Sequence, residues 1–106
     1  MQYLVETTEG PGFSSSSEAV SVLETSIIPS FDLLMKMQTD KKILAGGVPV
    51  GSRSFVFIIA AASNDEADRI LRSLPFWGVL HCKVTPLQSF GGRSEIERAN
   101  VQLGKA

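Results

Sequence analysis

Residues 55–61 of this chain read FVFIIAA, and residues 63–75 continue as SNDEADRILRSLP. The first stretch is apolar at every position, which is typical of a central strand covered on both faces of its sheet. The second stretch opens with a capping box, Ser63 to Glu66, carries apolar residues at helical spacing, and stops at Pro75. A buried strand that leads directly into an amphipathic helix predicts one half of an α+β domain.

The first part of the chain has the same order of a strand and then a helix. Residues 2–7 are rich in β-forming types, and Ser15 with Glu18 forms a second capping box. An apolar stripe then recurs at three- and four-residue spacing, as Val20, Leu23, Ile27, Phe31 and Leu34. Pro29 lies inside this stripe and predicts a kink or two abutting helices, with the helical region ending near Asp40.

Two further strands complete the expected sheet. Residues 43–50 are interrupted by Gly46-Gly47 and contain Pro49, which predicts an edge or bulged strand. Residues 79–87 form the last core strand. The order βαββαβ predicts an α+β, ferredoxin-like fold with an antiparallel four-stranded sheet, the first strand central, the last at an edge, and both helices on one face.

Two helices cannot cover both faces of this sheet. Val56, Ile58 and Ala60, or their alternates, would remain as an apolar patch, and such patches usually mark interfaces. We therefore expect two sheets to pack face to face as a dimeric α+β barrel. The domain is expected over residues 1–92, and residues 93–106 are expected to be a C-terminal tail. In that tail Ser94 and Glu97 could cap a short helix that takes part in subunit contacts.

Composition narrows the class of protein. The chain has 106 residues, a formal charge of −1, and one cysteine, Cys82, so it allows no internal disulfide and no structural zinc cluster. Its basic residues are scattered, which disfavours nucleic-acid binding. No signal peptide and no apolar run of membrane-spanning length are visible. We expect a cytoplasmic protein with no metal and no cofactor, whose partners are further copies of itself and a small molecule.

Four segments carry a resemblance to a known family. They are Ser73-Leu74-Pro75-Phe76-Trp77, Val84-Thr85-Pro86-Leu87-Gln88-Ser89-Phe90, Ile28-Pro29-Ser30-Phe31 and Ala45-Gly46-Gly47. Together they resemble muconolactone isomerase-like proteins, over residues 1 to about 92. The resemblance implies a dimeric α+β barrel, higher homo-oligomers, and a small pocket between sheet and helices. Family members shift a double bond in an unsaturated lactone by moving a proton. The family pattern has acidic residues where this chain has His81 and Lys83, which alters the charge of the expected pocket.

Strand alternation selects the candidate catalytic residues. It places Tyr3, Val5 and Thr7, with Leu80, Cys82 and Val84, under the helices. Glu6, His81 and Lys83 then share the opposite surface. His81 is the only histidine, and histidine ordinarily changes charge near neutral pH, so we expect it to shuttle the proton with Glu6 assisting.

The remaining candidates are expected to bind substrate. Lys83 or Arg53 would hold a substrate carboxylate, and Phe76 and Trp77 would line the pocket. Each of these residues also has a simpler interpretation: a surface histidine, a cross-strand Glu6–Lys83 ion pair, and aromatic side chains that fill the core. Two other functions remain open. One is a non-enzymatic oligomeric protein that binds a ligand or serves in assembly, and the other is a cofactor-free oxygenase of the same fold.

Overall fold

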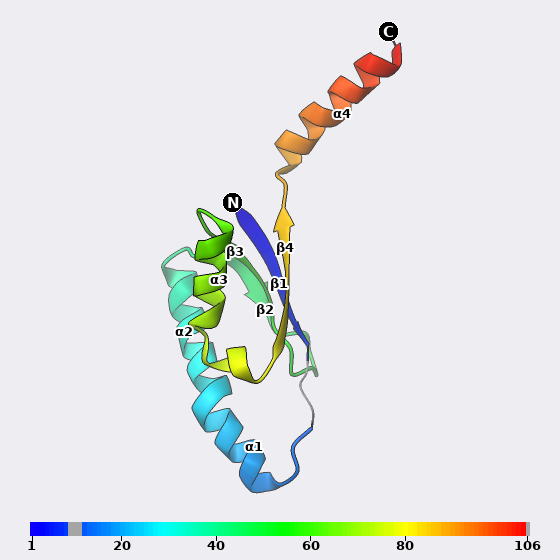
Figure 1. Cartoon of the computed structure of the whole chain (residues 1–106). Helices are drawn as coiled ribbons and strands as arrows, with labels where there is room; N and C mark the ends of the chain where they lie inside the picture. Colours follow the sequence, from blue (N-terminus) through cyan, green and yellow to red (C-terminus); the bar gives the residue numbers. More distant parts are fainter. Residues whose placement is uncertain (9–11, 106) are drawn as a thin grey trace.

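The computed structural model describes residues 1–8 and 12–105, and its elements follow the predicted order (Figure 1). The strands are β1 (Gln2–Thr8), β2 (Ile43–Gly47), β3 (Val56–Ala60) and β4 (His81–Leu87). The helices are α1 (Ser16–Val22), α2 (Ile28–Thr39), α3 (Asn64–Arg72) and α4 (Phe90–Lys105). A π-helical turn, η1 (Leu23–Ile27), joins α1 to α2, and a 3-10 turn, η2 (Pro75–Gly78), follows α3. The stretch Glu9-Gly10-Pro11-Gly12, whose composition predicts a turn, falls largely outside the described residues.

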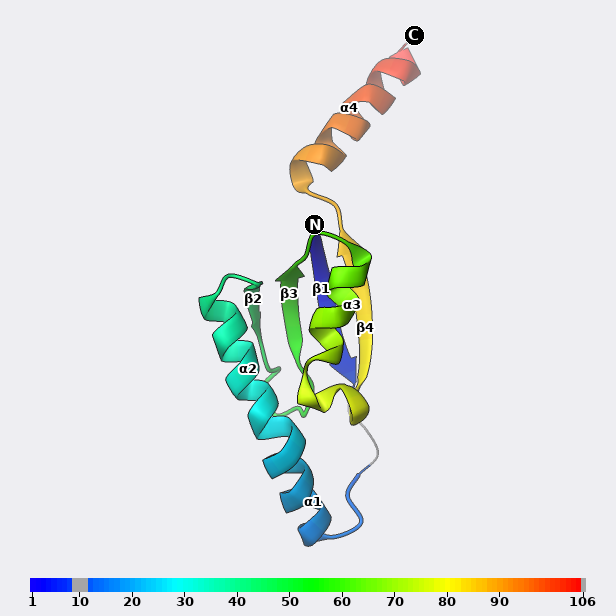
Figure 2. The same cartoon turned by 60° about the vertical axis from the view of Figure 1, so that its left-hand side comes forward.

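The four strands form one antiparallel sheet in the order β2-β3-β1-β4. This confirms the predicted α+β class, the central position of β1, and the edge positions of β2 and β4. Figure 2 shows α2 and α3 side by side on the same face of the sheet. In the part of the chain that the structure describes, no helix lies over the opposite face, as the sequence predicts.

Alternation along β1 sets which side chains enter the core. Tyr3, Val5 and Thr7 are buried, whereas Leu4 and Glu6 are only half-buried on the other face. Thr7 also contributes polar contacts, because its hydroxyl accepts the Phe55 backbone N–H at 2.8 Å. The prediction that Tyr3, Val5 and Thr7 lie on the helix-covered face is therefore confirmed.

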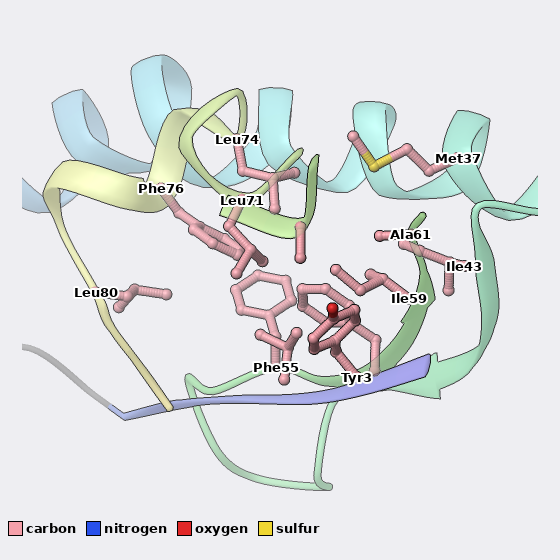
Figure 3. Close-up of a cluster of buried hydrophobic side chains, with 13 residues drawn as sticks. Tyr3, Met37, Ile43, Phe55, Ile59, Ala61, Leu71, Leu74, Phe76 and Leu80 are labelled. Atoms are coloured by element: carbon pink, nitrogen blue, oxygen red, sulfur yellow. The ribbon is translucent and has the colours of Figure 1, made fainter. Parts of the chain in front are cut away.

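The core lies between the sheet and the helices. Figure 3 shows its larger members, among them Tyr3, Phe55, Ile59, Leu71, Leu74 and Phe76. The Phe55 ring lies 4.9 Å from the Phe76 ring between centroids, at a tilt of 46°. The Tyr3 hydroxyl donates to Asn64 Oδ1 at 2.6 Å, which ties the central strand to the start of α3. This contact gives the buried phenol the polar partner that it needs.

The helical region around Pro29 consists of two α-helices joined through η1, in agreement with the predicted interruption. The Ile28 backbone N–H reaches the Leu23 carbonyl, five residues back, as a π-helical turn requires. Proline lacks an amide hydrogen and crowds the preceding turn, so a wider turn ahead of Pro29 accommodates it. The helical region ends at Thr39, next to the predicted end at Asp40.

Both predicted capping boxes form in part. Ser15 Oγ accepts the Glu18 backbone N–H at 3.1 Å, and Ser63 Oγ accepts that of Glu66 at 3.2 Å. Each glutamate, however, bonds the backbone N–H of the residue before the serine: Glu18 bonds that of Ser14, and Glu66 that of Ala62. The serines cap as predicted, and the glutamates secure the approach of the chain to each helix.

Strand β2 is shorter than the predicted 43–50, because regular pairing ends at Gly47. A register shift occurs between Ile43 and Ala45, which agrees with the predicted bulged edge strand. Gly46 lies so close to β3 that an added Cβ would stand 2.5 Å from Phe57 Cβ and 2.7 Å from the Val56 carbonyl oxygen. The close approach of two backbones requires glycine there.

Helix α4 projects away from the body of the domain (Figure 1). It begins at Phe90, earlier than the predicted tail helix, because Ser89 makes the first contacts: its hydroxyl accepts the Gly92 N–H and its carbonyl the Arg93 N–H, both at 3.0 Å. The predicted cap at Ser94 and Glu97 is therefore wrong. Glu97 instead pairs with Arg93 at 3.0 Å. The side chain of Phe90 is 98% exposed.

Candidate functional site

An apolar cavity lies between the α1–η1–α2 helical region and the loop that joins β2 to β3. Its volume is about 400 Å³, within the usual range for small-molecule sites. Its lining is Gly12, Phe13, Ala19, Val22, Leu23, Ile27, Phe31, Val48, Ser52, Arg53, Ser54, Phe55, Val79 and Leu80. We call this space the inner chamber.

The predicted apolar stripe of the first helix explains this chamber. Leu23, Ile27 and Phe31 line it, and Leu23 and Phe31 remain exposed rather than entering the core. The Phe31 ring packs on Phe55, 5.0 Å between centroids, and forms one wall. A stripe that faces an empty apolar space suits a ligand with an apolar body.

Arg53 is the only charged residue among the described residues that line the inner chamber. Its guanidinium carbon lies 5.2 Å from the centroid of the Phe13 ring, a cation–π contact. Beside it, the Ser52 and Ser54 hydroxyls are 2.6 Å apart. An arginine with two nearby hydroxyls at an otherwise apolar site can bind and orient a carboxylate.

A second space of about 420 Å³ adjoins the chamber, and we call it the vestibule. Its lining is Gly12, Phe13, Glu18, Val22, Trp77, Gly78, Val79, Leu80 and His81. It therefore contains two of the predicted site residues, His81 and Trp77. Glu18 is fully exposed there, and hydrogen bonds from the Ser14 side chain and backbone lower the pKa of its carboxyl group. Glu18 is thus ionised at neutral pH.

Glu6 and Lys83 lie elsewhere, on the face of the sheet that no helix covers. The β1–β4 register pairs Glu6 with Lys83 and Thr8 with His81. Glu6, Lys83 and His81 therefore share one face, as alternation predicts. No Glu6–Lys83 ion pair forms among the described residues, whose ion pairs are Arg72–Asp68 and Arg93–Glu97. Of the three, His81 is the one that also lines a cavity.

The two predicted aromatic contacts differ in position. Phe76 is 0% exposed and lies in the core, so it lines neither the inner chamber nor the vestibule. Trp77 is half-buried in the vestibule, and the Arg72 guanidinium carbon lies 5.1 Å from its ring centroid. The structure thus places Trp77 in the wall of the vestibule and Phe76 in the core.

Residues 1–92 match the family model for muconolactone delta-isomerase. This chain belongs to the muconolactone delta-isomerase family. The family resemblance expected from the sequence is therefore confirmed, over the same residues. No curated protein matches the chain.

Two solved structures share the fold of this family member. A crystal structure of muconolactone isomerase superposes with a TM-score of 0.68 at 16% identity, covering 84% of this chain and 90% of that one. The 5-chloro-2-hydroxyhydroquinone dehydrochlorinase from Burkholderia phenoliruptrix, in complex with 2,5-dihydroxybenzoquinone, gives 0.61 at 19% identity, with 87% and 98% covered. At these identities the likeness establishes the fold.

Two of the segments that carry the family resemblance meet in this structure. Ser30 is buried in α2, and its hydroxyl donates to the Ser26 carbonyl at 2.6 Å. The same hydroxyl accepts the Phe76 backbone N–H at 2.9 Å. This contact joins the Ile28–Phe31 segment to the Leu74–Trp77 segment. The motifs therefore secure the scaffold behind the chamber.

Sequence reasoning missed Phe13 as a site residue. Phe13 follows the sequence Gly10-Pro11-Gly12 and precedes four serines, so it belongs to no apolar periodicity that would have marked it. Its meeting with Arg53 depends on two loops far apart in the sequence. The only available signal was an isolated aromatic residue in a polar segment.

The described residues contain no group of three His, Cys, Asp or Glu side chains that could hold a metal ion. No helix in the described part of the chain is long and apolar enough to cross a membrane. Cys82 is half-buried, and its burial raises the pKa of the thiol, so it is a poor nucleophile at neutral pH.

Proposed function

We propose that this protein is a cofactor-independent isomerase that moves a proton within a small, anionic, unsaturated lactone or related acid. One observation carries the proposal: an apolar chamber with one cation, Arg53, adjoins a vestibule that contains the only histidine, His81. Membership of the muconolactone delta-isomerase family supports the same reaction class.

Arg53 would fix the orientation of the substrate. Its planar guanidinium can bind a carboxylate through two parallel hydrogen bonds, which a lysine cannot do. The phenylalanine and aliphatic side chains of the chamber would then enclose the apolar part of the ring. With the carboxylate at Arg53 and the ring in the inner chamber, the reacting carbon would meet His81 across the border that the chamber and the vestibule share.

His81 would carry the proton. In the first step its imidazole takes a proton from the saturated carbon at the far end of the conjugated system, and the electron pair of that C–H bond spreads through the double bond into the carbonyl as a dienolate. In the second step the imidazolium returns the proton to the carbon next to the carbonyl, and the double bond shifts. Substrate and product have the same composition, so the reaction needs no oxidant or reductant.

Glu6 and Lys83 would contribute through assembly. They lie on the uncovered face of the sheet, together with half-buried Leu4 and Ile58. We propose that this face packs against a second copy to form a dimeric barrel, in which Lys83 or Glu6 acts near the vestibule of either subunit. Ile58→Asp should convert the assembly to monomer in light scattering, whereas Asp at exposed Ala62 should not. A monomeric parent protein would contradict this assembly.

The test of the reaction is turnover of muconolactone by the full chain. His81→Ala and His81→Gln should both abolish turnover, and Arg53→Gln should mainly raise KM, since it removes a binding contact. Lys36→Gln serves as the control, because it changes an exposed lysine of α2 that lines neither the inner chamber nor the vestibule. Turnover that is unchanged in both His81 variants would contradict the assigned role.

A non-enzymatic ligand-binding protein is the second candidate. It is favoured by the lining of the inner chamber, where no described residue is a carboxylate or an imidazole. Saturable binding of a small carboxylate, with no conversion of any unsaturated lactone, would support this second candidate over the isomerase.

A further inference from the structure

Phe13 belongs to both cavities. The inner chamber and the vestibule share Gly12, Phe13, Val22, Val79 and Leu80, so they meet along this border. Among the described residues of this border, Phe13 alone carries an aromatic ring. Its side chain is half-buried and lies against the Arg53 guanidinium, 5.2 Å from the guanidinium carbon to the ring centroid.

We infer that Phe13 is a specificity-determining residue that divides one elongated site and thereby limits how large a ring system the ligand can carry. The inference rests on the proposed use of the chamber as a ligand site. The proposed isomerase reaction involves only the substrate carboxylate and the transferred proton. It sets no limit on the size of the ligand that either cavity accepts.

The two cavities are similar in volume but differ in the polarity of their linings. The inner chamber, at about 400 Å³, has an apolar lining and can enclose a single ring. The vestibule, at about 420 Å³, is more polar, with His81 and Glu18 in its wall. A ligand with two linked rings has to occupy both spaces, and the Phe13 ring stands between them.

Arg53 has two functions in this arrangement. It stacks on Phe13 and so holds the dividing ring in place. In the proposed binding mode it also donates N–H groups to the ligand carboxylate from the wall of the inner chamber, which it lines. The preferred ligand is therefore a monocarboxylate with one ring, in which the ring fills the inner chamber and the carboxylate lies next to Arg53.

The experiment compares two acids, phenylacetate and biphenyl-4-acetate, by titration calorimetry and ligand-observed NMR on the full chain. The parent protein should bind phenylacetate more tightly. Phe13→Ala should shift the ratio of the two affinities toward biphenyl-4-acetate by about tenfold or more, the usual size of a change in pocket fit. Phe13→Leu should shift it in the same direction by less.

Two variants serve as controls. Phe90→Ala removes the same side chain from exposed α4, outside both cavities, and should leave the ratio unchanged. Arg53→Gln should weaken both acids together, because it removes the carboxylate contact. Circular dichroism and melting temperature establish that each variant is folded, and Phe13→Leu replaces Phe13→Ala if the latter is not.

The outcomes distinguish failure of the role assigned to Phe13 from failure of the ligand site itself. An affinity ratio that stays the same in Phe13→Ala and Phe13→Leu, with phenylacetate still bound, overturns the role of Phe13 and leaves the ligand site intact. If the parent protein binds neither acid, the chamber is not a carboxylate site. The proposed binding mode and the inference then fail together.

Discussion

Ser30→Ala tests how the two family segments are held together. Ser30 is 0% exposed, and its hydroxyl bridges the Ser26 carbonyl and the Phe76 backbone N–H. In the alanine variant the Phe76 N–H is buried without an acceptor. We expect a loss of stability, because a buried donor left unsatisfied keeps its full desolvation cost.

The change in the free energy of unfolding has two destabilising contributions and one stabilising contribution. An unsatisfied buried N–H costs about 1–3 kcal/mol, and the loss of a contact to the Ser26 carbonyl adds to this. Alanine is the better helix former by about 0.5 kcal/mol, which offsets part of the loss. The net destabilisation should be about 2 kcal/mol, or a fall of about 8–16 °C in melting temperature for a domain of this size.

The assay is thermal and urea unfolding followed by circular dichroism at one fixed protein concentration, because assembly would shift the transition. Thr25→Ala is the matched control: its hydroxyl also donates to a carbonyl four residues back, at 2.7 Å, but it is exposed to water. That variant should be neutral or slightly stabilised. Equal effects of the two substitutions would refute the role assigned to the Ser30 bridge.

Three further predictions concern local geometry. Gly46→Ala should destabilise by about 2 kcal/mol, because its Cβ would meet Phe57 at 2.5 Å and force a backbone shift, whereas Gly47→Ala, with open space around it, should cost well under about 1 kcal/mol. Ser63→Ala should cost about 1 kcal/mol through loss of the helix cap, measured by urea unfolding. Burial raises the pKa of the Cys82 thiol, so iodoacetamide labelling of the native protein should rise with pH at a higher midpoint than labelling of the urea-unfolded chain; coincident midpoints would contradict this.

Local signals were sufficient to predict the scaffold. The apolar run at 55–61, the two serine caps and the alternation of β1 each depend on neighbouring residues. The structure has an inner strand over Val56–Ala60, both serine caps and the predicted alternation of β1. The cap of α4 was misplaced, because Ser89 precedes two glycines that interrupt helical periodicity. Ser94, further along the chain, therefore offered the clearer local pattern.

The candidate site was predicted less completely, for a physical reason. Alternation correctly grouped Glu6, His81 and Lys83 on one face, but it carries no information about where a cavity lies. The cavities form where the ends of separate loops meet, and Phe13 joins Arg53 across about forty residues of sequence. The positions of Phe76 in the core and Trp77 in the vestibule likewise depend on the tertiary path after Pro75, which no local pattern specifies.

The most direct test of the central claim is proton NMR of muconolactone in heavy water with a high concentration of the parent protein. The account predicts loss of a ring-proton signal and growth of the signals of the shifted double bond, and it predicts that neither occurs with His81→Ala. No exchange over several hours with the parent protein would contradict proton-transfer catalysis and leave the family scaffold with a ligand-binding role.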